Sequence, residues 1–149
     1  MKTFTASILL LTAFMTASCK HISFTNPKSI SELFTYTDMH NTDCKSKLKH
    51  DGEQIVIVAY IQKLNTFATE NRFQIFENAD IGSDRIDVDV SENSKEVFDK
   101  ISQQLSKLDV NSFVRITVKG VIRGKGLAVN GTCRMGVFLT ISSPDYIKF

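Results

Sequence analysis

The chain has 149 residues and a mass of 16.7 kDa, which is the size of one ordinary domain. It contains 18 Lys and Arg and 16 Asp and Glu, and this near balance of charge excludes a strongly basic nucleic-acid tail and an acidic disordered segment. An apolar share of 42% and a charged share of 23% are typical of a folded soluble domain, and only 2 Pro and 7 Gly exclude a linker or a collagen-like chain.

The first 18 residues have the pattern of an export signal rather than of a folded element. Lys2 is a short charged start, residues 4–15 are an apolar run, and residues 16–18 are small. The apolar run of about 12 residues is too short for a helix that crosses a bilayer, which takes about 20. We therefore expect residues 1–18 to be a signal peptide that is removed.

Cys19 follows the small residues directly. An ending of small residues before a Cys resembles the lipobox of bacterial lipoproteins, in which lipid is attached to the Cys that cleavage leaves first in the chain. Thr16 stands where that box has Leu, and the Ser-Cys-Lys junction is similar to the looser boxes of Bacteroidetes-type lipoproteins. The resemblance implies lipidation of Cys19, with residues 19–27 as a tether, and several acyl chains hold a protein firmly to a membrane. The alternative is plain secretion with Cys19 unmodified.

The residues after Cys19 favour a location in the periplasm. Lipoproteins of that group that reach the cell surface resemble one another in carrying acidic residues just after the Cys, and residues 20–24 contain none. We expect a lipid-anchored protein of the bacterial cell envelope that faces the periplasm, with inner or outer membrane left open.

Two cysteines remain for the folded part, Cys44 and Cys133, which lie 89 positions apart. An even number of cysteines in an oxidising compartment predicts a disulfide between them. His40 precedes Cys44 by four residues, which on a helix places both on one face and leaves a Cys-His nucleophile as a minor alternative. A metal site of His40, Cys44 and His50 is another, although its spacing matches no zinc-ligand pattern. We assign no catalytic, cofactor-binding or metal-binding residue and expect no cofactor.

The folded part begins with a helix. Asn26-Pro27 indicates its start, with Asn as the cap and Pro at the first helical position. Residues 30–37 then place apolar side chains at three- and four-residue spacing. Residues 38–50 are polar and continue the helix or form a loop, and Asp51-Gly52 is a turn signal.

Three strands follow the turn. Residues 54–63 are β-branched and apolar on both faces, so this strand must be covered on both sides. A polar turn leads to a second strand over residues 72–76. Residues 85–90 alternate strictly, which predicts a half-buried third strand. Its Ile86, Val88 and Val90 are expected to face the core, and its Arg85, Asp87 and Asp89 the solvent.

A second helix over residues 94–108 has apolar residues at helical spacing, with Ser91 or Ser94 as its cap. Residues 113–122 form a fourth strand in which Gly120 indicates a bulge.

The chain ends in a hairpin and a short tail. Gly124 and Gly126 are expected to end the fourth strand, and Asn130-Gly131 is a hairpin signal. Residues 136–142 form the fifth strand, and Tyr146, Ile147 and Phe149 are expected to pack back as a tail. The expected core consists of Ile55, Ile57, Ile61, Phe73 or Ile75, Ile86, Val88, Val90, Phe98, Ile101, Leu105, Val114, Ile116, Val118 and Leu139.

The order helix, three strands, helix, two strands is the chain order of the OB-fold, a five-stranded barrel. We therefore expect an α+β, mostly β domain over residues 28–149. It would be an OB-like barrel with a leading N-terminal helix and a second helix between strands three and four. Gly120 fits the strand coiling that a barrel needs. The alternative is an open antiparallel sheet with two helices on one face.

A family resemblance points to the same fold. Ser31-Glu32-Leu33-Phe34, Lys47-Leu48-Lys49, the strand at 55–61 and Val118-Lys119-Gly120-Val121 resemble the small bacterial OB-fold lipoproteins of the tRNA-anticodon-binding-like group. The resemblance covers most of residues 28–142 as an order of element types, and Ala59 stands where the group usually has Gly. It implies a barrel on a lipid anchor, and the group's name reflects fold analogy, which does not establish RNA binding.

The expected function is that of a non-enzymatic binding or interaction module held at the membrane through lipid on Cys19. An envelope protein is the expected kind of partner, and the ligand and the oligomeric state are left open. No Gly-rich phosphate loop, Gly-x-Ser-x-Gly or His-Glu-x-x-His motif is present, which argues against an enzyme. The alternatives are binding of single-stranded nucleic acid or of an oligosaccharide through the barrel, and a small envelope enzyme.

Nucleic acid is the disfavoured partner. Phe73 and Phe76 alternate along the second strand, so at most one of them can be a stacking platform. Outward Asp87 and Asp89 would repel phosphate. Basic residues do gather on the last strands, at Arg115, Lys119, Arg123, Lys125 and Arg134. Exposed aromatic side chains would favour an oligosaccharide, and Tyr36 and Phe67 are the candidates.

Overall fold

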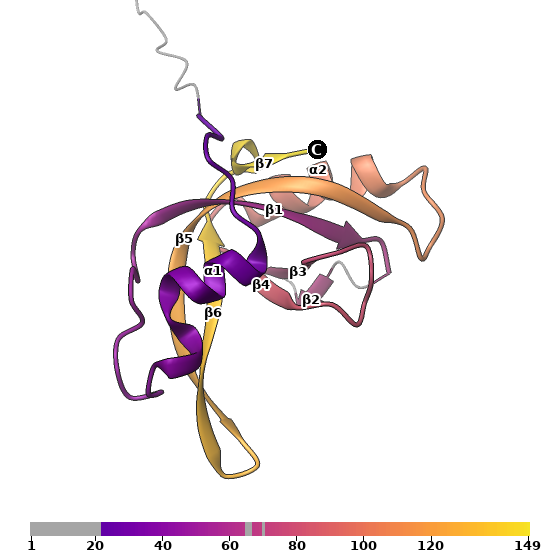
Figure 1. Cartoon of the computed structure of the whole chain (residues 1–149). Coiled ribbons are helices and arrows are strands. Elements are labelled where there is room, and N and C mark those ends of the chain that lie inside the picture. The colour runs from indigo at the N-terminus through magenta and orange to yellow at the C-terminus, as the bar shows by residue number, and fades with distance from the viewer. Residues whose placement is uncertain (1–21, 65–66, 70) are drawn as a thin grey trace, which may run out of the picture.

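The computed structural model describes residues 22–64, 67–69 and 71–149 (Figure 1). The expected signal peptide and Cys19 lie outside the described residues. No helix within these ranges is long and apolar enough to cross a membrane. This described part of the chain is mostly β with two α-helices, as the sequence predicts. Its elements are α1 (Ile30–Thr37), η1 (Met39–Asn41), β1 (Gln54–Gln62), β2 (Phe67–Thr69), β3 (Arg72–Phe76), β4 (Arg85–Val90), α2 (Ser94–Leu105), β5 (Phe113–Val129), β6 (Thr132–Ile141), η2 (Pro144–Tyr146) and β7 (Ile147–Lys148).

Five of the strands close into a ring, in the order β1-β3-β4-β6-β5 with β5 pairing back to β1. Neighbours in the ring are antiparallel except β4 and β6, which run parallel with Val88 opposite Leu139. The chain reaches β6 from β4 through α2 and β5. Because the ring closes, the alternative of an open sheet is wrong.

The seam between β1 and β3 is the narrowest join of the ring. In the described part of the chain it consists of one residue pair, Tyr60 with Phe76. The start of α1 is tied to both sides of this seam. Lys28 forms a parallel bridge with Ile57 of β1. Glu77, directly after β3, accepts hydrogen bonds from the N–H groups of Ile30 and Ser31 at 2.6 and 3.1 Å.

Helix α1 begins later than the sequence predicts. Its N-cap is Ser29, whose side chain accepts from the N–H of Glu32, while the Glu32 carboxylate accepts from the N–H of Ser29. Asn26 has a φ of 53° and caps nothing, so the expected start at Asn26-Pro27 is wrong. Helix α2 is likewise preceded by Asn93, whose side-chain amide donates to the Ser142 carbonyl, rather than by a capping Ser.

Strand β5 does not end at its glycines. It runs for 17 residues through Gly120, Gly124 and Gly126 and pairs with β6 over its second half. A Cβ added to Gly124 would lie 2.7 Å from the Cβ of Leu48, and one added to Gly126 would lie 2.7 Å from the Cys44 carbonyl oxygen. These glycines therefore admit the loop of residues 42–53, which crosses the hairpin in contact with its backbone.

The predicted core is largely confirmed. Phe73 and Ile75 are both fully buried, because residues two apart in a strand point to the same face, and here that face is turned to the core. Phe98 and Val114 are only partly buried and pack against the core from outside. The C-terminal tail packs back as expected: β7 pairs with β5 at Thr117 and Val118, and Ile147 is buried.

Candidate functional site

Residues 22–28 cross the outer face of the ring where β1 and β5 lie side by side. The N–H of Lys28 donates to the Val56 carbonyl at 2.8 Å, and the N–H of Val58 donates to the Lys28 carbonyl at 2.9 Å. Val56 is buried although it faces outward, because this segment covers it. The segment enters near β7 and leads into α1 (Figure 1), and a cleft lies on each side of it.

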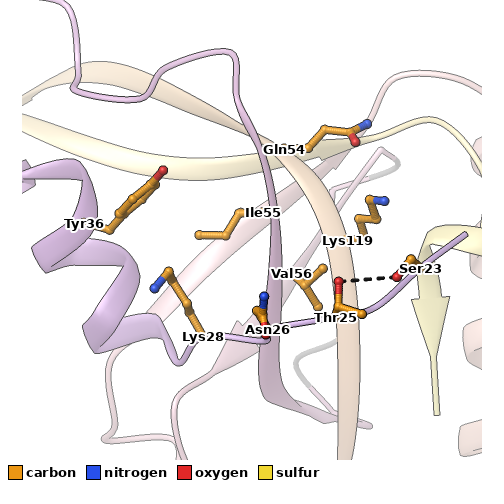
Figure 2. A pocket seen from close by; sticks show the side chains of 9 residues that line it. All are labelled: Ser23, Thr25, Asn26, Lys28, Tyr36, Gln54, Ile55, Val56 and Lys119. Atoms are coloured by element: carbon orange, nitrogen blue, oxygen red, sulfur yellow. Dashed lines mark hydrogen bonds between the residues drawn. The ribbon is translucent and has the colours of Figure 1, made fainter.

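The first cleft has a volume of about 330 Å³ (Figure 2). Its floor comes from β1 and β5, where Val56 and Lys119 are register partners and therefore present their side chains to the same face. Tyr36 of α1 stands at one end of the cleft, and Lys28 and Asn26 lie between it and Thr25. The lining is Ser23, Thr25, Asn26, Lys28, Tyr36, Gln54, Ile55, Val56 and Lys119.

The second cleft has a volume of about 350 Å³ and lies on the side of β7. Arg115 and Thr117 alternate with buried residues along β5, and Lys148 of β7 is the register partner of Thr117, so all three point outward. The lining is Phe24, Pro27, Val58, Arg115, Thr117, Lys148 and Phe149.

The two clefts share one electrostatic character. Among the described residues, each cleft is lined by two basic side chains, and neither is lined by an Asp or Glu. We call Lys28, Arg115, Lys119 and Lys148 the cationic face. Arg115 and Lys148 are exposed, and Lys28 and Lys119 are half-buried. Ammonium and guanidinium groups in such a setting attract anions, and the neighbouring hydroxyl and amide groups can add hydrogen bonds.

The side chain of Tyr36 is held from behind by two residues of the loop before β1. Its ring stacks on His50 with centroids 3.9 Å apart, and its hydroxyl donates to Glu53 at 3.0 Å. His50 Nδ1 lies 3.0 Å from the same carboxylate oxygen. The hydrogen bond with His50 is the largest cause that lowers the pKa of Glu53, and the bond from Tyr36 is the next. The bond to Glu53 also raises the pKa of Tyr36. The Nζ of Lys28 lies 5.4 Å from the Tyr36 ring centroid.

Cys44 and Cys133 lie at disulfide distance, with Cα atoms 5.7 Å apart, as the sequence predicts. A Cys44 sulfur bonded in this way is available neither as a nucleophile nor as a metal ligand. His40 is exposed on η1 against the edge of Phe34, while His50 binds Glu53, so the two histidines have separate surroundings. Across the described ranges, no three His, Cys, Asp or Glu side chains are grouped so that they could hold a metal ion.

Asp87 and Asp89 do not simply face solvent, which corrects the sequence-based expectation. Arg72 of β3 lies between them: its Nη2 donates to Asp89 at 3.1 Å, and its Nη1 lies 3.3 Å from Asp87. Gln74 also donates to Asp87 at 3.2 Å. The hydrogen bond to Asp89 raises the pKa of Arg72. The single positive charge of Arg72 offsets one of the two negative charges, so the pair of carboxylates repels phosphate less than expected.

Strand β3 offers no aromatic platform. Phe73 and Phe76 are both fully buried, and the ring of Phe76 packs edge-on against Phe113 at 5.7 Å. Tyr36 is the aromatic side chain at the first cleft, and Phe24 and Phe149 line the second. The side chain of Phe67 lies outside the description. The sequence identifies Arg115 and Lys119 as basic and outward, but it contains no local signal for Lys28 and Lys148, which come from opposite ends of the chain.

No protein-family model matches the chain, and no curated protein matches it in sequence.

Proposed function

We propose that this protein is a lipoprotein of the bacterial cell envelope, anchored through lipid on Cys19 and facing the periplasm, that acts as a non-enzymatic binding module. The observation that carries the binding role is the cationic face with its two clefts. Four basic side chains share an outward surface, and no Asp or Glu among the residues that the structure describes lines its clefts. Such a face is suited to a polar ligand that carries negative charge.

An OB-like barrel is the architecture that we propose for this module. The ring order, the parallel join of β4 and β6, and the position of α2 before β5 support it, because the OB-fold is a five-stranded Greek-key barrel. The similarity to small bacterial OB-fold lipoproteins is part of the same proposal. The buried rings of Phe73 and Phe76 favour other ligands over single-stranded nucleic acid.

The anchor is tested by changing the residue that would carry the lipid. Cells that express the full chain or its Cys19→Ala variant are fed a fatty-acid probe, and label on the protein is measured. We expect the wild type to be labelled and the Cys19→Ala variant to be unlabelled. Cys133→Ala is the control, because it also removes a cysteine and should keep the label. Equal labelling of Cys19→Ala and wild type would overturn the anchor.

Oligosaccharide binding is the second candidate function, and one observation favours it. The Tyr36 ring stands at the first cleft beside hydroxyl and amide side chains, an arrangement in which a ring can stack on a sugar while polar groups bind its hydroxyls. Titration calorimetry with neutral and acidic glycan fragments tests it. Binding by the wild type that Tyr36→Ala abolishes and Tyr60→Ala retains would support a saccharide ligand, and no heat with any fragment would contradict it.

A further inference from the structure

We propose that the cationic face rests on the anionic headgroup layer of the membrane that holds the anchor, so that the hairpin of β5 and β6 points away from the bilayer. This inference depends on the proposed lipid anchor at Cys19 and adds a partner and an orientation to it. The partner is identified by charge complementarity and by where the chain meets the barrel.

The chain after Cys19 is too short to separate this face from the bilayer. Ile22 follows Cys19 by three residues, and an extended chain spans at most about 3.6 Å per residue, so the two Cα atoms lie within about 11 Å. The potential of an anionic membrane acts over about one Debye length, 8–10 Å at ordinary ionic strength. The segment that begins at Ile22 lies directly on the cationic face, with Phe24 lining the second cleft.

The side chains on this face match a headgroup layer. Arg115 and Lys148 are exposed, and each interacts favourably with an anionic surface. The partly buried rings of Phe24 and Phe149 line the same cleft. Apolar contact together with charge attraction is what determines the binding strength of interfacial protein surfaces.

A second basic region provides the internal comparison. Arg123, Lys125 and Arg134 are exposed on the β5–β6 hairpin. They share one face of it, because Arg134 is the register partner of Leu127, which follows Arg123 and Lys125 at alternate positions of β5. The tip of this hairpin lies at the end of the molecule opposite to β7 and to the entry of the chain (Figure 1). If net basic charge alone decided the orientation, the hairpin would compete for the membrane. If the short tether decides, only the cationic face contacts it.

Hydrogen exchange on the lipidated full-length protein in nanodiscs tests the orientation. One set of nanodiscs contains phosphatidylcholine alone and the other includes phosphatidylglycerol. We expect amides of residues 22–28, 115–119 and 147–149 to exchange about tenfold more slowly with phosphatidylglycerol, and those of residues 123–134 to be unchanged. Raising NaCl from about 0.05 to about 0.5 M should remove the protection without any substitution, because salt screens exposed charges.

Matched charge reversals sharpen the test. Arg115→Glu with Lys119→Glu should abolish the protection, whereas Arg123→Glu with Lys125→Glu, the same change of charge on the hairpin, should keep it. Equal exchange in both nanodiscs, protection of the hairpin, or equal loss in both variants would overturn the inference. Protection of the face by acidic glycan fragments in neutral nanodiscs, without an effect of phosphatidylglycerol, would assign it to a saccharide instead. Mass spectrometry of the sample separates the two proposals: a chain without lipid overturns the anchor, and a lipidated chain without protection overturns only the orientation.

Discussion

The two ends of this molecule are both basic but are built in different ways. At the hairpin end, the loop of residues 42–53 is fixed against β5 and β6 by the Cys44–Cys133 pair and by buried Leu48. At the tether end, residues 22–28 are joined to β1 by the backbone bonds of Lys28. One crossing segment is cross-linked and tightly packed, and the other is held by a bridge of a single residue.

The difference lies in what each crossing does to the surface beneath it. At the hairpin end, β5 has glycines where the loop crosses it, so the loop packs directly against the β5 backbone and leaves no space between them. At the tether end, β5 keeps Arg115, Thr117 and Lys119, which hold the crossing segment away from parts of the sheet and leave clefts on both sides. Close packing at one end thus stabilises the fold, while looser packing at the other leaves charged groups accessible to a ligand.

The largest expected effect comes from removing the cross-link at the hairpin end. Cys44→Ser with Cys133→Ser should lower the free energy of unfolding by up to about 4 kcal/mol, because the pair closes a loop of 89 positions in the unfolded chain. Guanidinium midpoints measure it. The wild type treated with reductant should match the variant, and a variant as stable as the oxidised wild type would show that the pair does not stabilise this end.

Adding a side chain where the loop of residues 42–53 crosses the glycines of β5 should have the next largest effect. An Ala at Gly124 places its Cβ 2.7 Å from the Cβ of Leu48, so the loop must move, and we expect a cost of about 1–3 kcal/mol. Gly82→Ala is the control, because the nearest atoms to its Cβ would be those of the Asp80 side chain, at 3.4 Å and beyond, and its effect should stay within about 0.5 kcal/mol. Equal shifts of the urea midpoint in the two variants would mean that Gly124 and Leu48 are not tightly packed.

Amide exchange compares the two ends directly through four hydrogen bonds of similar length. At the hairpin end, the N–H of Gly52 donates to the Ile122 carbonyl at 2.8 Å, and the N–H of Ile122 donates to the Glu53 carbonyl at 2.9 Å. At the tether end, the N–H groups of Lys28 and Val58 make bonds of the same two lengths, 2.8 and 2.9 Å. We expect the Lys28 and Val58 amides to exchange about tenfold faster, because local opening of a bridge of one residue disrupts little else. A single common rate for all four would contradict the comparison.

The contrast between the ends also explains which features the sequence can predict. Periodicity identifies β4 and α2 closely, because each buries one face against the core and the alternation of residue types records it. The extent of β5 escapes the same reasoning. A Gly that ends a strand and a Gly that admits a crossing loop look identical until Leu48 and Cys44 are known to lie above Gly124 and Gly126.

The candidate site is less predictable than the fold for a related reason. Alternation along β5 indicates that Arg115 and Lys119 share an outward face. Lys28 and Lys148 join them only because one forms a bridge to β1 and the other pairs with β5 after the chain has closed its ring. These are contacts between distant parts of the sequence. No local pattern of residue types encodes them.

The smallest expected effect concerns Glu53, which connects the two ends. It belongs to the loop of residues 42–53 and accepts a hydrogen bond from Tyr36, which lines the first cleft. Hydrogen bonds from His50 and then Tyr36 lower the pKa of Glu53 in the folded protein. Its contribution to stability is therefore fully present above the ordinary pKa of about 4.5 and is lost as pH falls through the lowered value. The Glu53→Gln variant cannot lose a charge there, so the difference between its urea midpoint and that of the wild type should shrink below about pH 4.5. Glu92→Gln changes an exposed carboxylate on the loop before α2 and serves as the control, with a difference from wild type that is expected to stay constant over the same range. A Glu53→Gln difference that stays constant, or grows as the solution is acidified, would show that these hydrogen bonds do not stabilise the folded protein.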